Sequence, residues 1–417
     1  MTAPAIEIDI SWHTDITELG LAEWNRLAES LPTPLLDYEW LLQMERSKSI
    51  TPDHGWLPCH LALRRSGDLI AVAPLYIKGH SQGEFVYDYM WADVASQLGV
   101  KFYPKLVGMS PATPAVGYRF LIDPTEDEEA LTDFMLRAID SFCEANELSG
   151  ANFNFVDPDW GTLLASRGYS GWYHQSFEWR NTGFGTFDDY LAAFNKNQRR
   201  NIRRERRSLI DSGVTIRAHT GDEIPHSFYE RMWDYYESTN DQFGPWAAKF
   251  LNRDFFTKGL EEFRHRLLFI AATIDEGSED PVALSMLLTK GDVLIGRYWG
   301  TDRMIDNLHF DACYYAPIEW GIEHGIEIID PGAGSPHKLR RGFVAVGNYS
   351  YHKYRDPRMR EVMEEHIERI NTAEEDRIIQ MNSSVPLKVL PDIPSFLAGK
   401  PHVYPTPTID NNPTITT

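Results

Sequence analysis

Cysteine is scarce in this chain of 417 residues: the only three are Cys59, Cys143 and Cys313, and they are widely separated. That spacing supplies neither a disulfide framework nor a Cys-x-x-Cys metal pair, which favours a reducing compartment. No stretch reaches eighteen consecutive apolar residues, so no membrane-spanning helix is predicted. The first ten residues lack a basic segment followed by an apolar one, and we therefore expect no signal peptide and a cytoplasmic protein.

Positive charge is also in short supply. Forty Lys and Arg residues face 61 Asp and Glu residues, which gives a formal net charge of −21. A general nucleic-acid or anionic-membrane binder needs a basic face to neutralise phosphates, so we expect no DNA partner, although one local basic patch is present. With 42% hydrophobic residues, the chain can bury the cores of two or three domains.

The spacing of apolar residues in the first half predicts alternating helices and strands. Alternation of Phe85, Tyr87, Tyr89 and Trp91 is typical of a strand. The other predicted elements are helices at 18–31 and 36–47, a hairpin of strands at 60–65 and 69–78, a helix at 127–147, a strand at 151–156, a helix at 160–167 and a strand at 172–179.

The second half repeats this order of elements without repeating its residues. It is predicted to contain one long helix at 187–211, a strand at 214–218, helices at 227–238 and 254–264, strands at 267–274, 282–289 and 293–299, a helix at 312–324, a strand at 326–330 and a charged helix at 357–370. Helices, antiparallel strands, a helix and a strand in each half indicate an α+β fold built twice.

Three segments follow from this pattern. Residues 1–183 form the predicted N-terminal domain, and residues 184–380 form a C-terminal domain that carries the active site. Residues 381–417 contain seven prolines and no periodic apolar face. We expect this tail to be disordered and dispensable.

Several stretches of the sequence resemble the FemAB-like family of N-acyltransferases, which is related to the peptidoglycan-modifying aminoacyltransferases. They are residues 54–56, 73–85 (APLYIKGHSQGEF), 103–106, 187–191 with the basic run 199–207, 296–300 (GRYWG), 309–315 (HFDACYY), 337–338 and 341–343. The resemblance implies tandem GNAT-like domains, that is, two copies of the acyl-CoA N-acyltransferase fold with mixed, mostly antiparallel sheets flanked by helices. It also implies transfer of an acyl or aminoacyl group to a primary amine.

One stretch departs from the family. The family pattern before His-Lys is approximately Gly-Ala-Gln-Gly-Glu, whereas this chain has Gly332-Ala333-Gly334-Ser335-Pro336. A polar Gln and an acid are missing, which indicates another acceptor, another base or reduced activity.

A basic helix lies between residues 195 and 207, where seven Lys and Arg residues face one Glu. Because arginine offers bidentate contacts to phosphate, we predict that this helix clamps the phosphates of an acyl-CoA or an aminoacyl-tRNA, through Arg199, Arg200, Arg203 and Arg204. The alternative is that acids elsewhere in this acidic chain pair with the helix, which is then only a solvated face.

The segment from Asp330 to Phe343 is a second candidate site. A predicted strand ends at Asp330 and is followed by small residues, which allow close backbone approach, and then by His337, Lys338 and Arg341. Backbone N–H groups here could stabilise a tetrahedral oxyanion, with the basic residues contacting donor or acceptor. A tight turn with solvated basic residues is the alternative.

Proton transfer needs a base as well. His309, whose ordinary pKa of about 6.5 lies near cellular pH, and Asp311 are predicted to accept the proton of the amine, with Lys338 as their partner across the cleft. Further contacts to substrate are expected from Arg297, Tyr298, Tyr315, His337 and Arg341, and in the first half from His80, Ser81 and Glu84. A purely structural role for His309 is the alternative.

Two other kinds of site, a serine nucleophile and a metal site, are suggested by residues of the sequence but are disfavoured. The run from Gly79 to Gly83 reads Gly-x-Ser-x-Gly, yet that nucleophile elbow must lead directly into a helix, whereas a strand is predicted at 84–91. The histidines and acids of the second half show no metal-binding spacing, so no metal and no tightly bound cofactor are predicted.

The sequence therefore predicts an N-acyltransferase that works by direct attack of the amine, without a covalent enzyme intermediate. The donor stays open. The chain lacks the Arg/Gln-x-x-Gly-x-Gly/Ala loop of acetyl-CoA enzymes, which favours aminoacyl-tRNA, and lacks the long helical arm of the Fem proteins, which favours acyl-CoA. The acceptor is a small-molecule or peptide amine. The rival is a decayed transferase that only recognises an amino-sugar or peptide ligand, and the altered stretch at 334–336 supports it.

Overall fold

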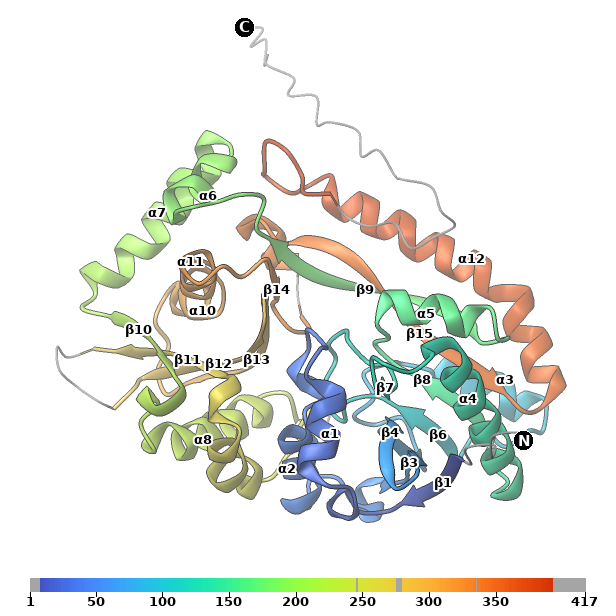
Figure 1. Ribbon diagram of the computed structural model, residues 1–417. Helices are drawn as coiled ribbons and strands as arrows, with labels where there is room; N and C mark the ends of the chain where they lie inside the picture. Colours follow the sequence, from blue (N-terminus) through green and yellow to red (C-terminus); the bar gives the residue numbers. More distant parts are fainter. Residues whose placement is uncertain (1–7, 245–246, 275–279, 335, 393–417) are drawn as a thin grey trace, which may run out of the picture.

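The computed structural model describes residues 8–244, 247–274, 280–334 and 336–392 (Figure 1). Its strands are β1 Ile8–His13, β2 Trp56–Pro58, β3 His60–Arg65, β4 Asp68–Ala73, β5 Leu75–Lys78, β6 Lys105–Gly108, β7 Leu121–Ile122, β8 Gly150–Phe153, β9 Ser170–Arg180, β10 Thr215–Thr220, β11 Leu267–Thr273, β12 Ala283–Lys290, β13 Val293–Thr301, β14 Ile328–Asp330 and β15 Val344–Tyr354. They form a four-stranded sheet in the order β1-β3-β4-β7 and an eleven-stranded sheet in the order β10-β11-β12-β13-β14-β9-β15-β8-β6-β5-β2.

The helices flank these sheets. They are α1 Leu21–Ala28, α2 Tyr38–Arg46, α3 Tyr89–Gln97, α4 Glu128–Ala145, α5 Pro158–Ala165, α6 Phe187–Ala193, α7 Lys196–Asp211, α8 Ser227–Asp241, α9 Leu260–Glu262, α10 Leu308–Phe310, α11 Ala316–Glu323 and α12 Pro357–Asn382, with the π-helical turn η8 Asp311–Tyr315 between α10 and α11. In each half a helix connects two parallel strands: α4 joins β6 to β8, and α11 joins β13 to β14.

The two halves exchange strands in the middle of the large sheet. β9, from the first half, lies between β14 and β15, and β15, from the second half, lies between β9 and β8. β9 and β15 are antiparallel over nine residue pairs, from Ser170↔His352 to Glu178↔Val344. The predicted boundary at residue 183 therefore separates two segments that share one continuous sheet.

Helix α12 crosses the β9–β15 ribbon and bonds to the outer edge of each strand (Figure 1). On β9, the side chain of Asn371 accepts from the Tyr173 N–H and donates to the Gly171 carbonyl, both at 2.8 Å. On β15, the buried Asn382 accepts from the N–H of Ala345 at 2.7 Å and donates to its carbonyl at 2.8 Å. Each asparagine thus satisfies backbone groups that no neighbouring strand pairs.

Most predicted elements are present, but some differ. The strand expected at 69–78 is two strands, β4 in the four-stranded sheet and β5 in the eleven-stranded sheet. The helix expected at 187–211 is two helices, because the buried Phe194 is extended and Asn195 caps α7 by accepting from the Gln198 N–H. The strand expected at 84–91 is absent from the described residues. Phe85 has a positive φ of 56° and Tyr89 begins α3, so the chain turns rather than extends there.

The tail prediction is wrong for the residues that the structure describes. α12 continues to Asn382, Val385 is buried, Leu387 bridges Phe194, and the Lys388 N–H donates to the Ala193 carbonyl at 2.9 Å. Residues 381–392 therefore dock on the C-terminal half. Residues 393–417 lie outside the described residues.

Candidate functional site

The strands β13 and β14 part at the centre of the large sheet. They are paired in parallel over three residues only, from Val293↔Ile328 to Ile295↔Asp330. Beyond these pairs β13 continues to Thr301, whereas the chain after Asp330 turns away through residues 331–334. A cleft of about 340 Å³ opens at this point and is lined by Gly296–Trp299, Pro331–Ala333, Ser285, His309, Cys313, Tyr314, residues of α8 and, from the first half, Phe85, Ala112 and Pro114.

A β-bulge shapes the wall of this cleft. β12 and β13 change register between Met286 and Leu287, so that Arg297 has no partner in β12. A bulge re-aims the side chain of the extra residue. The Arg297 guanidinium donates to the carbonyl of Ala112 at 2.8 Å and to the Tyr298 hydroxyl at 3.0 Å, while its Nε is buried without a partner. Arg297 therefore ties the cleft wall of one half to a loop of the other, and it lies with Tyr298 where the sequence predicted substrate contacts.

His309 is the predicted base that does face the cleft. Its ring packs edge-on against Trp299 and Tyr314, with centroids 5.2 and 5.3 Å away. Desolvation by these walls lowers the pKa of His309 to about 4, and the positive charges of Arg341 and Lys338 add to the shift. The imidazole is therefore neutral near pH 7 and can hydrogen-bond to substrate, but it is a weak proton acceptor.

Lys338 lies beneath the turn rather than in the cleft. It is buried, donates to the Gly332 carbonyl, and has its Nζ 5.2 Å from the centroid of the Phe177 ring. Burial lowers the pKa of Lys338 to about 8, a shift that the negative charge of Asp330 opposes. Lys338 thus supports the backbone of residues 332–334, which line the cleft. His337 is exposed nearby, and Ser335 lies outside the described residues.

Asp311, the other predicted base, does not line the cleft. It is buried and accepts from Arg206 of α7 at 3.2 Å, and Arg206 also binds Glu319 at 2.6 Å. Burial raises the pKa of Asp311, and the guanidinium opposes that shift. Helical periodicity alone could not show that α7 would supply a cation at this place.

Tyr315 and Arg341 are also turned away from the cleft, against the prediction of substrate contacts. The Tyr315 hydroxyl donates to Glu205 at 2.6 Å, and Arg341 donates to the same carboxylate at 3.2 Å. Arg341 in addition stacks on Phe310, with its guanidinium carbon 3.4 Å from the ring centroid. These groups fasten α7 to η8 and to the 336–341 turn.

The arginines of the basic helix α7 are only partly paired. Arg203 pairs with Asp188 at 3.2 Å, whereas the side chains of Arg199, Arg200 and Arg204 form no ion pair or hydrogen bond with any described residue. The Gln198 side chain donates to the Arg340 carbonyl at 2.7 Å. This contact places the start of α7 beside the turn that leads out of the cleft, so the free arginines remain candidates for phosphate binding.

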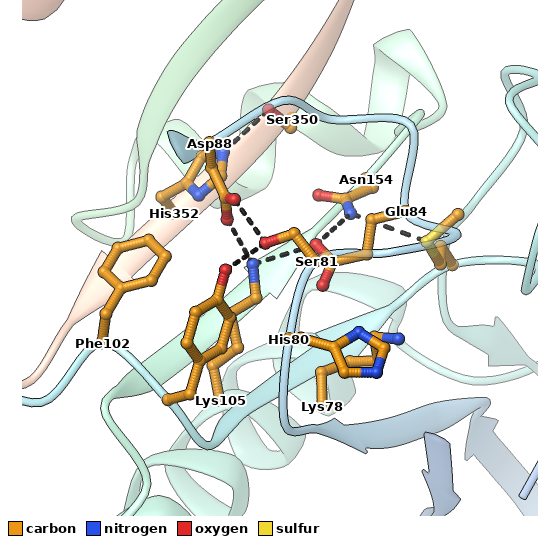
Figure 2. A network of polar contacts seen from close by, with 12 residues as sticks. Lys78, His80, Ser81, Glu84, Asp88, Phe102, Lys105, Asn154, Ser350 and His352 are labelled. Atoms are coloured by element: carbon orange, nitrogen blue, oxygen red, sulfur yellow. Dashed lines mark hydrogen bonds and ion pairs between the residues drawn. The ribbon is translucent and has the colours of Figure 1, made fainter. Parts of the chain in front are cut away.

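Ser81 and Glu84 lie in a buried network of the first half, and none of His80, Ser81 and Glu84 lines the cleft. Figure 2 shows the Lys105 ammonium between the carboxylates of Glu84 (2.9 Å) and Asp88. Ser81 binds Asp88 and the Tyr103 hydroxyl. Lys105, Glu84 and Asp88 are buried almost completely. The predicted substrate contacts of Ser81 and Glu84 are therefore replaced by internal ones, and His80 is half-buried over Gly55.

The same network shows why the serine of the Gly-x-Ser-x-Gly motif is not placed as a nucleophile. The strand predicted after the motif is absent from the described residues, but the motif still does not lead directly into a helix, because α3 begins only at Tyr89. Ser81 is also buried and bonded to an acid and a phenol, without a histidine base. Among the residues that the structure describes, no group of three or more His, Cys, Asp or Glu is placed to hold a metal ion, and no helix is long and apolar enough to cross a membrane.

Residues 15–389 match the model of the FemAB-like family, described as peptidoglycan biosynthesis/recognition. The chain belongs to the FemAB-like family. No curated protein matches this sequence.

Solved structures share the architecture at low identity. FemX is 12% identical over 83% of this chain and 98% of its own, with a TM-score of 0.53. A tandem GNAT protein from the clavulanic acid biosynthesis pathway is 11% identical over 84% of this chain and 99% of its own, with a TM-score of 0.43. L-PGS from Bacillus licheniformis is 13% identical over 81% and 98%, with a TM-score of 0.46. This FemAB-like protein thus shares the fold of FemX, with mixed, mostly antiparallel sheets flanked by helices, which is the α+β class that the sequence predicted. Its family supports a transferase.

Proposed function

We propose that this FemAB-like protein is an N-acyltransferase that moves an acyl or aminoacyl group onto a primary amine in the cleft between β13 and β14. The observation that carries the proposal is the parting of these parallel strands beside the Arg297 bulge. Beyond Ile295, no strand lies opposite β13 on its β14 side in the described residues, so backbone there can pair with a substrate. Backbone N–H groups directed at a carbonyl oxygen stabilise the oxyanion of acyl transfer.

The cleft supports direct attack rather than a covalent intermediate. Cys313 lines it, but burial raises the pKa of that thiol to about 12, so it is not a thiolate near pH 7. The amine itself is then the nucleophile. The donor is an acyl-CoA or an aminoacyl-tRNA, whose phosphates the free arginines of α7 would bind. The family description, peptidoglycan biosynthesis/recognition, supports a peptidoglycan-type amine as the acceptor class.

A recognition protein without transferase activity is the second candidate. It is favoured by the position of Asp311, which binds Arg206 and leaves no carboxylate beside His309 among the described residues. A recognition protein would bind an amine ligand but form no amide from either donor.

Donor binding tests the proposed site. Acetyl-CoA and an aminoacylated tRNA are titrated against wild type and Ala333→Trp, in which an exposed residue of the cleft becomes an indole that fills it. We expect one donor class to bind, and to raise unfolding stability by about 2.7 kcal/mol at one hundred times its Kd. Ala333→Trp should weaken that binding at least about tenfold, which corresponds to about 1.4 kcal/mol. The matched control Ala218→Trp, on β10, should bind normally. Failure of both donors to bind wild type contradicts the proposal.

A further inference from the structure

Two smaller pockets continue from the cleft toward the other half of the protein. An inner chamber of about 140 Å³ shares Phe85, Pro114, Gly332 and Ala333 with the cleft and extends to Asp330 and Asn348. A rear cavity of about 240 Å³ shares Asp330, Ser176 and Phe177 with the inner chamber. Asp330 therefore lines both spaces, and it belongs to the last residue pair before β13 and β14 part.

The strand exchange assembles the polar groups of these spaces. Asp330 ends β14, Asn348 belongs to β15, and Ser176 and Glu178 belong to β9. The remaining wall of the rear cavity is largely apolar, with Val293 and other branched residues of the sheet. A few polar groups in an apolar cavity are typical of a small-molecule site.

One buried acceptor of the inner chamber has no donor. The amide nitrogen of Asn348 donates to the Ser176 hydroxyl at 2.7 Å and to the His174 carbonyl at 3.4 Å. A carbonyl can only accept, so this contact fixes the orientation of the amide. The Oδ1 of Asn348 is then left without a hydrogen-bond partner, and it is buried because the residue is only 4% exposed. An unmet buried acceptor can take a hydrogen bond from an ordered water or from a ligand.

Asp330 adds a charged acceptor to the same pocket. It accepts the Gly332 N–H at 2.7 Å and forms no ion pair within the described part of the chain. The cations around it have other partners: Arg180 binds Glu178, Arg119 binds Asp157 and Glu128, and Lys338 binds the Gly332 carbonyl.

The charges facing Asp330 leave it basic enough to exchange a proton. Burial raises the pKa of Asp330 to about 6, and the negative charge of Glu178 adds to that rise. The Gly332 N–H and the positive charges of Lys338 and Arg297 oppose it. Near pH 7 the group is thus a carboxylate with a pKa close to working pH, which suits a general base.

We propose that Asp330, together with the Oδ1 of Asn348, binds the ammonium group of the acceptor and takes its proton. The inference rests on the proposed function and adds the acceptor site and the base to it. The N–H bond of the ammonium breaks and the proton moves to the Asp330 carboxylate. The freed lone pair then attacks the donor carbonyl carbon in the cleft, the C–S or C–O bond of the donor breaks, and the second proton lost by nitrogen passes to the leaving sulfur or oxygen.

Binding of a small ammonium ion tests this assignment without any donor. Propylammonium, neutral 1-propanol and propionate are titrated by NMR at pH 7.5 against wild type, Asp330→Asn and Asp93→Asn, an exposed acid on α3 that serves as control. We expect propylammonium to bind wild type and the control equally, at least tenfold more weakly to Asp330→Asn, and more tightly than the other two probes to wild type. Equal affinity in Asp330→Asn, tighter binding of propionate, or no binding of propylammonium to wild type overturns the proposal.

A pH titration of wild type keeps the test decisive should Asp330→Asn fail to fold. Between pH 7.5 and pH 4.5 the affinity for propylammonium should fall at least tenfold as Asp330 is protonated, while that for 1-propanol stays constant. A constant propylammonium affinity overturns the assignment. If donors bind the cleft but propylammonium does not bind, only the proposal of the acceptor site is refuted. If neither donor binds, the proposed function is lost as well.

Discussion

Replacement of Lys105 by methionine should destabilise the protein strongly and in a pH-dependent way. Lys105 and the two carboxylates it bonds, Glu84 and Asp88, are all essentially inaccessible to water. Removing one partner of a buried ion pair costs about 3–5 kcal/mol, because the remaining charge is unpaired. The variant can instead protonate Glu84. At pH 7 this costs about 3.7 kcal/mol for a glutamate with an ordinary pKa of about 4.3, which lies within the same range.

The sign of the pH dependence follows from the variant's carboxylates. Burial already raises the pKa of Glu84, and loss of the ammonium raises it further. The folded variant then holds a proton that the unfolded chain releases above about pH 4.3, so its stability falls as pH rises, by about 1.4 kcal/mol per unit. The deficit of Lys105→Met relative to wild type should therefore be about 2–3 kcal/mol larger at pH 7 than at pH 5.

Urea unfolding at the two pH values measures this difference. The control is Lys101→Met, which removes an exposed lysine nearby and should change the unfolding free energy by less than about 0.5 kcal/mol. The triple variant with Glu84→Gln and Asp88→Asn should recover most of the loss, because no charge is left unpaired. A deficit below about 1 kcal/mol, or one that does not change with pH, would refute the reasoning.

Three further outcomes are expected. Asn382→Ala should lower the free energy of unfolding, measured in urea, by about 2–5 kcal/mol, because the N–H and the carbonyl of Ala345 in β15 both lose their hydrogen bonds to the Asn382 side chain. A loss under about 0.5 kcal/mol would contradict this role. Arg200→Glu combined with Arg204→Glu should weaken donor binding and flatten its salt dependence without changing the melting temperature, whereas unchanged affinity would leave α7 a solvated face. The pH profile of kcat/KM should fall as pH drops through about 6, the pKa of Asp330, and a fall only near pH 4 would assign the base to His309 instead.

Local sequence signals were sufficient for most of the elements. The helices at 128–145 and 227–241 and the hairpin of β12 and β13 follow from periodicity and turn residues. β15 was missed altogether, although it forms eleven residues of the central sheet. Its partner β9 lies more than 160 residues away, and nothing local specifies which strands pair across such a separation.

The candidate site was predictable only in part. The motif at 296–300 and the turn after Asp330 do line the cleft, and His309 faces it. Asp311 and Arg341 were misplaced, because helix spacing shows which residues share a face but not which distant side chains neutralise them. Asp330, Asn348 and Glu178 come from three strands that only the exchange between the halves brings together. Their role could be inferred only from the assembled sheet.

Amide formation is the measurement that tests the central claim most directly. Wild type and Ala333→Trp are incubated with acetyl-CoA or an aminoacylated tRNA and a panel of primary amines that includes amino-sugars and short peptides, and the products are identified by mass spectrometry. The account predicts an amide from wild type with one donor class, formed at least about 100-fold more slowly by Ala333→Trp although that variant remains folded. Absence of any amide with both donor classes, while an amine ligand still binds, would contradict the transferase and favour the recognition protein.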